Sequence, residues 1–232
     1  MRSDNLYSVL LVGPNEIQKS LLFQCAVHFA EKGTKVLYIS STTLSALPTP
    51  IHGVSPPSTA ALSHIRFMYL PGYQDLFKHL FSLHQHAHVS NVVIVESLDH
   101  YFNLADRNIP NKNHEREMHA ALVCASLIDA MSVCTRHCGK PAVLIASFQC
   151  NDMKINPLID LFFSNIVWLV ESDTDNEVAV TNAVILPQQS SRKQVVFKPR
   201  NWDGTLILHK ILQLINVEEI PPVPQHKIQR HL

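Results

Sequence analysis

The segment from Leu10 to Ser20 constrains the fold of this 232-residue chain more than any other. Its order is that of an apolar strand, a loop and the start of a helix. Gly13, Lys19 and Ser20 fit the phosphate-binding pattern G-x-x-x-x-G-K-[ST], with Gln18 where the second glycine belongs. In such a loop, backbone N–H groups cradle phosphates, the lysine reaches the outer phosphates, and the hydroxyl binds Mg²⁺. The segment therefore predicts the framework of a nucleotide site, which Gln18 damages because glutamine adopts a glycine backbone conformation only at a cost.

Apolar runs alternate with amphipathic stretches along the chain. We expect strands at 7–12, 35–39, 65–70, 91–95, 142–148 and 166–170, and helices at 19–31, 72–86, 115–136 and 156–163. Strands separated by helices predict a mostly parallel sheet with helices on both faces. After residue 170 the pattern indicates antiparallel strands at 177–185, 194–198 and 205–208, with a hairpin turn at Asp203-Gly204. The predicted fold class is α/β.

One domain is expected over residues 1–219, followed by a flexible, Pro-containing tail at 220–232. Residues 40–63 are rich in Ser, Thr and Pro and predict a long loop with a short helix at its end. The helix at 115–136 is apolar nearly all round, which predicts a buried position. Met118 and Met131 are interpreted as core residues of that helix.

The formal net charge of +0 argues against a protein that coats nucleic acid by charge alone. A local basic strip can still bind DNA, and Arg192, Lys193, Lys198 and Arg200 form the best candidate cluster. The alternative is that these charges only solvate and protect a strand edge.

The five cysteines are odd in number and follow no disulfide framework, which favours a reducing compartment. Cys134, His137 and Cys138 resemble metal ligands, but no second pair stands at zinc spacing, so no zinc site is predicted. No apolar run is interpreted as long enough to cross a membrane.

Polar side chains stand where two apolar strands end. Glu96 follows the strand at 92–95, the place of the acid that orients magnesium in nucleotide hydrolases. Asp99 is a second carboxylate nearby, interpreted as a helix cap or surface residue. Gln149 follows the strand at 142–148 and either senses a terminal phosphate or serves as a turn residue. With Ser20, Glu96 is the predicted contact to Mg²⁺.

The chain resembles the RecA-type recombinases, and most closely the small recombinase paralogues of the animal Shu complex, which pair with a SWIM-type zinc-finger protein. The resemblance covers about residues 10–209. It depends on the early phosphate loop, the stretch 64–71 leading into Asp75-Leu76-Phe77, the strand 92–96 running on to Leu98 and Tyr101, and the closing elements Val195-Val196-Phe197 and Trp202-Asp203-Gly204.

The resemblance implies a RecA-like P-loop NTPase core that binds ATP, Mg²⁺ and single-stranded DNA. It also implies a SWIM-type partner, contact with recombinase filaments, and a nuclear role in homologous recombination repair, with no membrane. On this pattern Lys19 and Ser20 bind phosphate and Mg²⁺, Glu96 replaces the Walker B aspartate, and Gln149 takes the phosphate-sensing position. Three departures weaken hydrolysis: Gln18, Glu96 and the lack of a carboxylate at 38–42, after the second strand.

The leading hypothesis is therefore a recombination accessory protein with weak or absent ATP turnover. Two alternatives stay open: a competent ATPase stimulated by single-stranded DNA, and a P-loop small-molecule kinase. Against the kinase, the stretch 103–140 has no Arg-rich lid segment and carries only three scattered arginines. The string Phe23-Gln24-Cys25-Ala26 fits the F-x-x-A element by which the family contacts filaments, but its place in a helix predicts burial, so no interaction is assigned to it.

Overall fold

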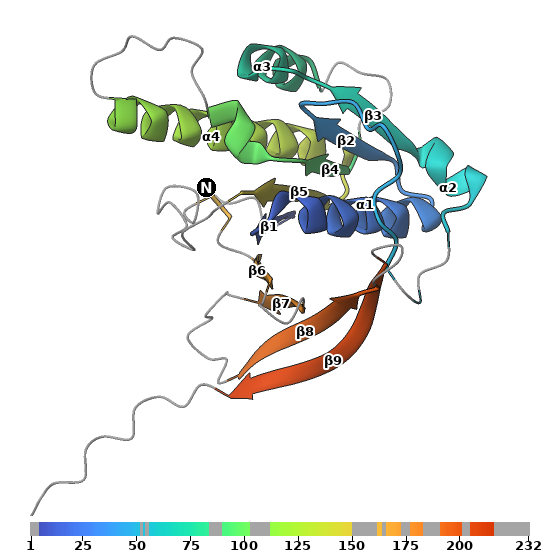
Figure 1. The fold of residues 1–232 in the computed structure, drawn as a ribbon. Coiled ribbons are helices and arrows are strands. Elements are labelled where there is room, and N and C mark those ends of the chain that lie inside the picture. The colour runs from blue at the N-terminus through green and yellow to red at the C-terminus, as the bar shows by residue number, and fades with distance from the viewer. Residues whose placement is uncertain are drawn as a thin grey trace, which may run out of the picture.

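The computed structural model describes residues 5–51, 53, 56–83, 90–102, 112–149, 162–163, 166–172, 177–182, 191–200 and 205–215. Its centre is a nine-stranded sheet of order β3-β2-β4-β5-β1-β6-β7-β8-β9 (Figure 1). Six strands run parallel: β1 (Leu6–Val12), β2 (Val36–Ser40), β3 (Ile65–Tyr69), β4 (Val92–Val95), β5 (Ala142–Phe148) and β6 (Ile166–Ser172). The predicted parallel core is confirmed.

Three antiparallel strands extend the sheet beyond β6, as the sequence predicts. They are β7 (Val178–Asn182), β8 (Ser191–Pro199) and β9 (Leu206–Ile215). β9 is six residues longer than the four expected at 205–208, because its apolar pattern continues to Ile215. The predicted turn at Asp203-Gly204, the helix at 156–163 except for its last two residues, and the tail at 220–232 lie outside the described residues.

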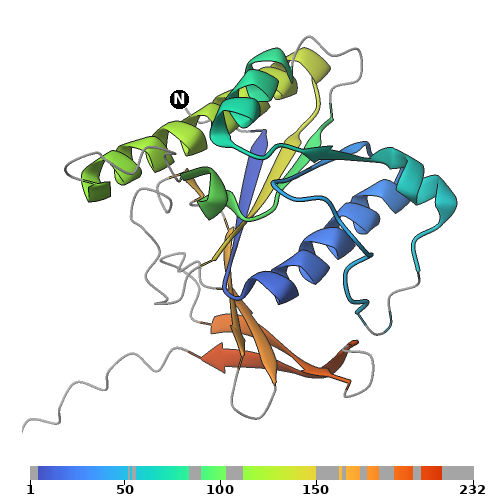
Figure 2. The ribbon, with the colours of Figure 1, turned by 45° about the horizontal axis from the view of Figure 1, so that its top comes forward.

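Helices cover both faces of the parallel part (Figures 1 and 2). On one face lie α1 (Asn15–Glu31) and α2 (Thr59–His64), whose apolar side chains pack on alternate residues of β2 and β4 such as Tyr38 and Ile94. On the other face lie α3 (Tyr73–Ser82), the short 3-10 helix η2 (Leu98–Phe102) and α4 (Lys112–Cys138), which pack on the intervening residues. Strands buried on both faces explain the uninterrupted apolar runs in the sequence.

Two expectations about the helices are wrong. Helix α1 begins at Asn15 and not at Lys19, so the loop before it is shorter than the motif requires. Helix α4 is not buried all round: Met131 is in the core, whereas Met118 is 57% exposed, and Leu122 is exposed beside it. Both exposed residues lie on the outer side of a helix whose inner side faces the sheet.

Residues His114–Cys138 of α4 have the length and mean hydropathy of a membrane-spanning helix, contrary to the sequence interpretation. The inner side of this helix packs in the core with Val123, Leu127 and Met131. A core helix of a soluble protein has the same length and composition, so this property alone assigns no membrane.

Candidate nucleotide site

The connection between β1 and α1 is the feature on which a phosphate site depends. Val12 is the last residue of β1 and Asn15 the first of α1, so Gly13 and Pro14 alone join them. The N–H of Gln18 already donates to the carbonyl of Pro14 at 3.3 Å. The N–H groups of later residues, including Lys19, lie inside the helix, where carbonyls four residues earlier accept them. The stretch that cradles phosphates in a P-loop is therefore the first turn of a helix here.

Gly13 is needed for close packing in this connection. Its φ of +150° is one that side chains rarely adopt, and a Cβ at this position would lie 2.2 Å from the carbonyl oxygen of Val170 on β6. Its N–H donates to the carbonyl of Phe148 at 3.2 Å. The glycine therefore lets the start of the turn pass against β6.

The side chain of Gln18 is fully buried and points back to the sheet. Its Nε2 donates to the carbonyl of Leu11 at 3.2 Å and to that of Phe148 at 3.0 Å. It thereby ties the first turn of α1 to the ends of β1 and β5. No hydrogen-bond partner for its Oε1 is found among the described residues. A glycine at this position could make none of these side-chain contacts. Gln18 therefore has a structural role in anchoring α1, in place of the phosphate-binding role of the motif's second glycine.

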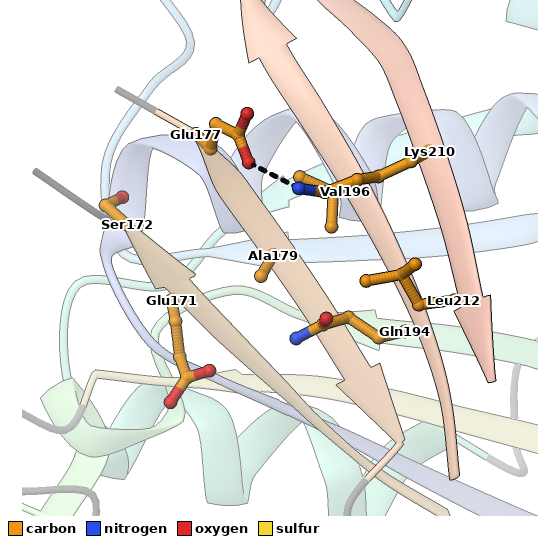
Figure 3. Close-up of a pocket in the computed structure, with 8 residues that line it drawn as sticks. All are labelled: Glu171, Ser172, Glu177, Ala179, Gln194, Val196, Lys210 and Leu212. Atoms are coloured by element: carbon orange, nitrogen blue, oxygen red, sulfur yellow. Dashed lines mark ion pairs between the residues drawn. The ribbon is translucent and has the colours of Figure 1, made fainter. Parts of the chain in front are cut away.

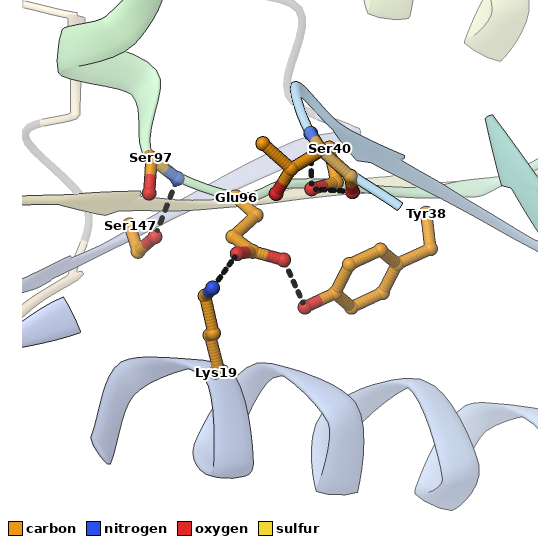
Figure 4. A network of polar contacts seen from close by, with 7 residues as sticks. Lys19, Tyr38, Ser40, Glu96, Ser97 and Ser147 are labelled. Atoms are coloured by element: carbon orange, nitrogen blue, oxygen red, sulfur yellow. Dashed lines mark hydrogen bonds and ion pairs between the residues drawn. The ribbon is translucent and has the colours of Figure 1, made fainter. Parts of the chain in front are cut away.

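Lys19 and Glu96 meet at the carboxyl ends of the strands, as the nucleotide interpretation requires. Lys19 Nζ lies 3.2 Å from Glu96 Oε1, and the Tyr38 hydroxyl donates to Glu96 Oε2 at 3.2 Å (Figure 4). The Glu96 side chain is 3% exposed and that of Lys19 34%. Burial, and then the charge of Glu96, raise the pKa of the Tyr38 hydroxyl, so it remains a donor. The carboxylate is thus held by one cation and one hydroxyl.

The residues after β4 and β5 hold each other in place. Ser97 has a φ of +51°, and its N–H donates to Ser147 Oγ at 2.9 Å. Asp99 Oδ1 accepts from the N–H of Gln149 at 2.9 Å. The Gln149 side chain is exposed beside this contact. Asp99 is therefore a positioning residue between two strand ends, a role that its spacing from Glu96 alone did not indicate.

ATP with Mg²⁺ is the cofactor that the motif implies, and the described geometry does not form a cradle for it. The required N–H groups lie within a helix, Lys19 faces Glu96, and the Glu16 carboxylate lies in the first turn of α1, where it opposes an anion. Ser20 is buried on the same helix. After β2, where a catalytic carboxylate would be needed, Ser40 Oγ instead donates to the carbonyl of Thr42 at 2.9 Å.

The predicted DNA-binding cluster lies on and just after β8, but not on one face. Lys193 and Lys198 are five residues apart on a strand, so they project to opposite faces of the sheet. Lys198 Nζ lies 3.1 Å from Glu177 Oε1, while Lys193 is exposed. Arg200 follows the strand, and its N–H donates to the carbonyl of Thr205 at 2.8 Å. The side chain of Arg192 lies outside what the structure describes.

Other chemistry-bearing groups lie away from Lys19 and Glu96. A hollow of about 420 Å³ lies on β6–β9, lined in part by Glu171, Glu177 and Lys210 (Figure 3). Cys134 is buried near the end of α4, and burial raises the pKa of its thiol to about 11, which keeps it protonated. Among the residues that the structure describes, no three His, Cys, Asp or Glu side chains gather to hold a metal ion.

Two contributors to the site were missed by sequence reasoning. Tyr38 is central in an apolar strand, so in sequence it resembles a core residue. In the structure it lies on the α1 face of the sheet and neighbours Ile94 on β4, and Ile94 is two residues before Glu96. That register was the one signal that could have found it. Gln18 was interpreted as damage to a motif, whereas a polar residue in a buried turn of a helix also signals a tie to backbone carbonyls.

Comparison with known proteins supports the fold. No protein-family model matches the chain, and no curated protein matches its sequence. Solved structures do match. The RadB recombinase has a TM-score of 0.53 at 13% identity over 88% of this chain and 91% of its own. The KaiC-like protein PH0186 from Pyrococcus horikoshii has a TM-score of 0.57 at 12% identity, over 88% of this chain and 89% of its own.

A DnaB-like replicative helicase matches with a TM-score of 0.57 at 12% identity over 90% of this chain. The chain spans 58% of the length of that helicase. The class of protein that the topology and these neighbours define is therefore the RecA-like fold of recombinase and helicase ATPase domains. At these identities the likeness establishes the fold alone.

Proposed function

We propose that this chain is an accessory protein of homologous recombination, a RecA-like module that acts by binding and not by turning over ATP. Its binding partners in this proposal are single-stranded DNA, a SWIM-type zinc-finger protein and recombinase filaments, and its place is the nucleus. The recombination setting rests on the resemblance of the sequence to the Shu-complex paralogues and agrees with a fold shared with the RadB recombinase.

The proposed lack of ATP turnover is supported by the contacts in the first turns of α1. The Gln18 N–H, the Gln18 side chain and the Lys19 ammonium all have partners within the protein, so a nucleotide would have to displace these contacts before gaining its own. ATP binding is accordingly weak or lost in this proposal, and Mg²⁺ binding with it.

The second candidate is an ATPase stimulated by single-stranded DNA. It is favoured by one observation: Lys19 and Glu96 lie 3.2 Å apart at the carboxyl ends of parallel strands, the edge where such sheets bind nucleotides. For this candidate, DNA or a partner would have to open the first turn of α1.

The deciding experiment measures ATP affinity and phosphate release by purified protein, with and without single-stranded DNA and partner. We expect no DNA-stimulated release and the same result for Lys19→Ala. Robust release that Lys19→Ala eliminates would establish the ATPase and refute the accessory proposal. Phosphate transfer to a small-molecule acceptor would establish the kinase.

DNA binding by the β8 cluster is tested through salt dependence. The variant with Arg192, Lys193, Lys198 and Arg200 all changed to alanine should reduce the slope of log affinity against log salt by about 0.7 for each phosphate that it no longer neutralises. Because Lys193 and Lys198 lie on opposite faces, the two single variants should differ from each other. Lys78→Ala on α3 is the control. An unchanged slope in the quadruple variant removes the cluster from the proposal.

A further inference from the structure

β9 forms one edge of the sheet and pairs with β8 along one side. Within the described residues, its other side is met at its start alone, where the N–H of Leu206 donates to the carbonyl of Pro50 at 3.1 Å and Ile51 forms a bridge. Figure 2 shows β9 at the margin of the molecule, away from the helices. An edge with free N–H and C=O groups is a template on which another strand can pair.

A row of aliphatic side chains crosses four strands and ends at this edge. Val170, Val180, Val195 and Ile211 are successive cross-strand neighbours on β6, β7, β8 and β9. Val170 is 1% exposed and Val180 8%, whereas Ile211 is 66% exposed. Since directly opposed side chains stabilise each other in a sheet, an apolar residue on a further strand would continue this row.

Lys210 and His209, near this edge, both lie close to the Glu177 carboxylate. Lys210 Nζ lies 3.2 Å from Glu177 Oε2 and His209 Nε2 3.6 Å from Glu177 Oε1. Figure 3 shows the Glu177–Lys210 pair over the face of the sheet. The rest of the strand, Ile-Leu-Gln-Leu-Ile, has no charge. The ladder with β8 shifts register between the pairs Phe197–Leu208 and Val196–Lys210 and is regular from Lys210 to Ile215.

The opposite edge of the sheet is built differently. β3 has five residues, and its second, Arg66, is exposed. Short strands and exposed charges are the usual protection of an edge against pairing. β9 has ten residues and lacks that protection from Ile211 onward, so its edge is the one suited to a partner strand.

We propose that β9 pairs antiparallel with β9 of a second copy of this chain, about a two-fold axis at Ile211. A two-fold interface places the same surface of both copies in contact, so that surface must be complementary to itself. The β9 edge meets this requirement. Ile211 meets Ile211 of the second copy, which continues the aliphatic row. No like charges oppose one another in the pair beside it, Lys210 with Leu212.

The first test is the mass of the isolated full-length chain in solution, by sedimentation equilibrium over a range of concentrations. We expect a dimer, and Ile211→Lys should raise its dissociation constant at least tenfold because two ammonium groups then oppose each other at the axis. Leu122→Lys on α4, also at an exposed aliphatic position, is the matched control and should leave the mass unchanged.

The second test fixes the register and does not depend on a destabilising charge. Ile211→Cys should cross-link two chains under mild oxidation, because cysteines directly opposed across strands are within disulfide reach. Leu208→Cys should not, because its own counterpart lies six residues away, about 20 Å. The unchanged chain gives the background from its five native cysteines.

Three results would overturn the proposal. One is a monomer at all concentrations. Another is a dimer that survives Ile211→Lys or cross-links equally from both cysteine positions, since another surface would then be in use. The third is a monomer whose binding to a SWIM-type protein is lost in Ile211→Lys, because the edge would then take a strand from a different chain.

Discussion

At the residue scale, a buried carboxylate decides what Lys19 does. Glu96 has a 3% exposed side chain, and the Lys19 ammonium and the Tyr38 hydroxyl are the groups that offset its desolvation. Removing one member of such a pair costs more than the pair contributes, because the other charge stays buried. A lysine that reads as a phosphate ligand in sequence is therefore structural in the folded chain.

This argument predicts that Lys19→Met lowers the free energy of unfolding by about 3 kcal/mol, the lower end for a broken buried pair because Lys19 is partly exposed. The double variant Lys19→Met, Glu96→Gln should recover at least half of the loss, since no charge is left unpaired. Denaturant unfolding of the wild-type chain and of both variants measures these free energies of unfolding. Additive losses would show that the two side chains do not depend on each other.

Gln18 supports a second prediction at this scale. Gln18→Ala removes two hydrogen bonds to carbonyls at the ends of β1 and β5 and leaves a cavity, which should cost about 2–4 kcal/mol. Gln74→Ala, at an exposed position on α3, should change stability by less than about 0.5 kcal/mol. Equal, small effects at both positions would mean that Gln18 does not anchor the helix.

At the scale of elements, the contact between α3 and α4 contains a buried histidine. The His119 ring lies edge-on to Tyr73, with 4.5 Å between ring centroids. Burial lowers the pKa of His119 below its usual 6.5, and the nearby Phe102 backbone opposes this shift in part. Below pH 6.5 the unfolded chain therefore takes up the proton more readily than the folded chain, and stability falls.

We expect His119→Phe to lessen the loss of unfolding free energy between pH 6.5 and 5.5, by at most about 1.4 kcal/mol per pH unit. The ring contact with Tyr73 is kept, so the effect isolates the proton. His137→Gln, exposed on the same helix, should leave the pH dependence as it is. If the His119 variant shows the same dependence of unfolding free energy on pH as the wild type, a group other than His119 is responsible for that dependence.

At the scale of the whole molecule, exposed apolar side chains remain on both the helical layer and the sheet edge. Phe81, Met118 and Leu122 are exposed on α3 and α4, and Ile211 on β9. Exposed apolar side chains mark an interaction surface when they form a contiguous patch, and such a patch is what the proposed partner would cover.

Partner binding should therefore raise the thermal midpoint of this chain. At a free partner concentration of one hundred times the dissociation constant, the gain by mass action is about 2.7 kcal/mol. The measurement is the unfolding temperature of the chain with and without the co-purified SWIM-type protein. Identical midpoints under saturating conditions would contradict this prediction and the partner proposal.

The sequence determined the α/β class, the order of the strands along the chain and the two layers of helices, because buried parallel strands and amphipathic helices have distinct apolar periods. It also placed Glu96 and Gln149 at strand ends, where the structure has them, whereas Lys19 and Ser20, expected at a helix start, lie in the second turn of α1. Phe23 and Ala26 lie in the core, as their place on α1 predicts.

Only the tertiary structure decided what those residues do. The hydrogen bond from Gln18 to the carbonyl of Phe148 and the Lys19–Glu96–Tyr38 contact join segments far apart in the chain. Local spacing cannot encode such contacts, because their energy comes from groups that meet only after the sheet has formed. For the same reason, the sequence could not predict the row of aliphatic side chains that ends at Ile211, because its members become neighbours only when four strands pair.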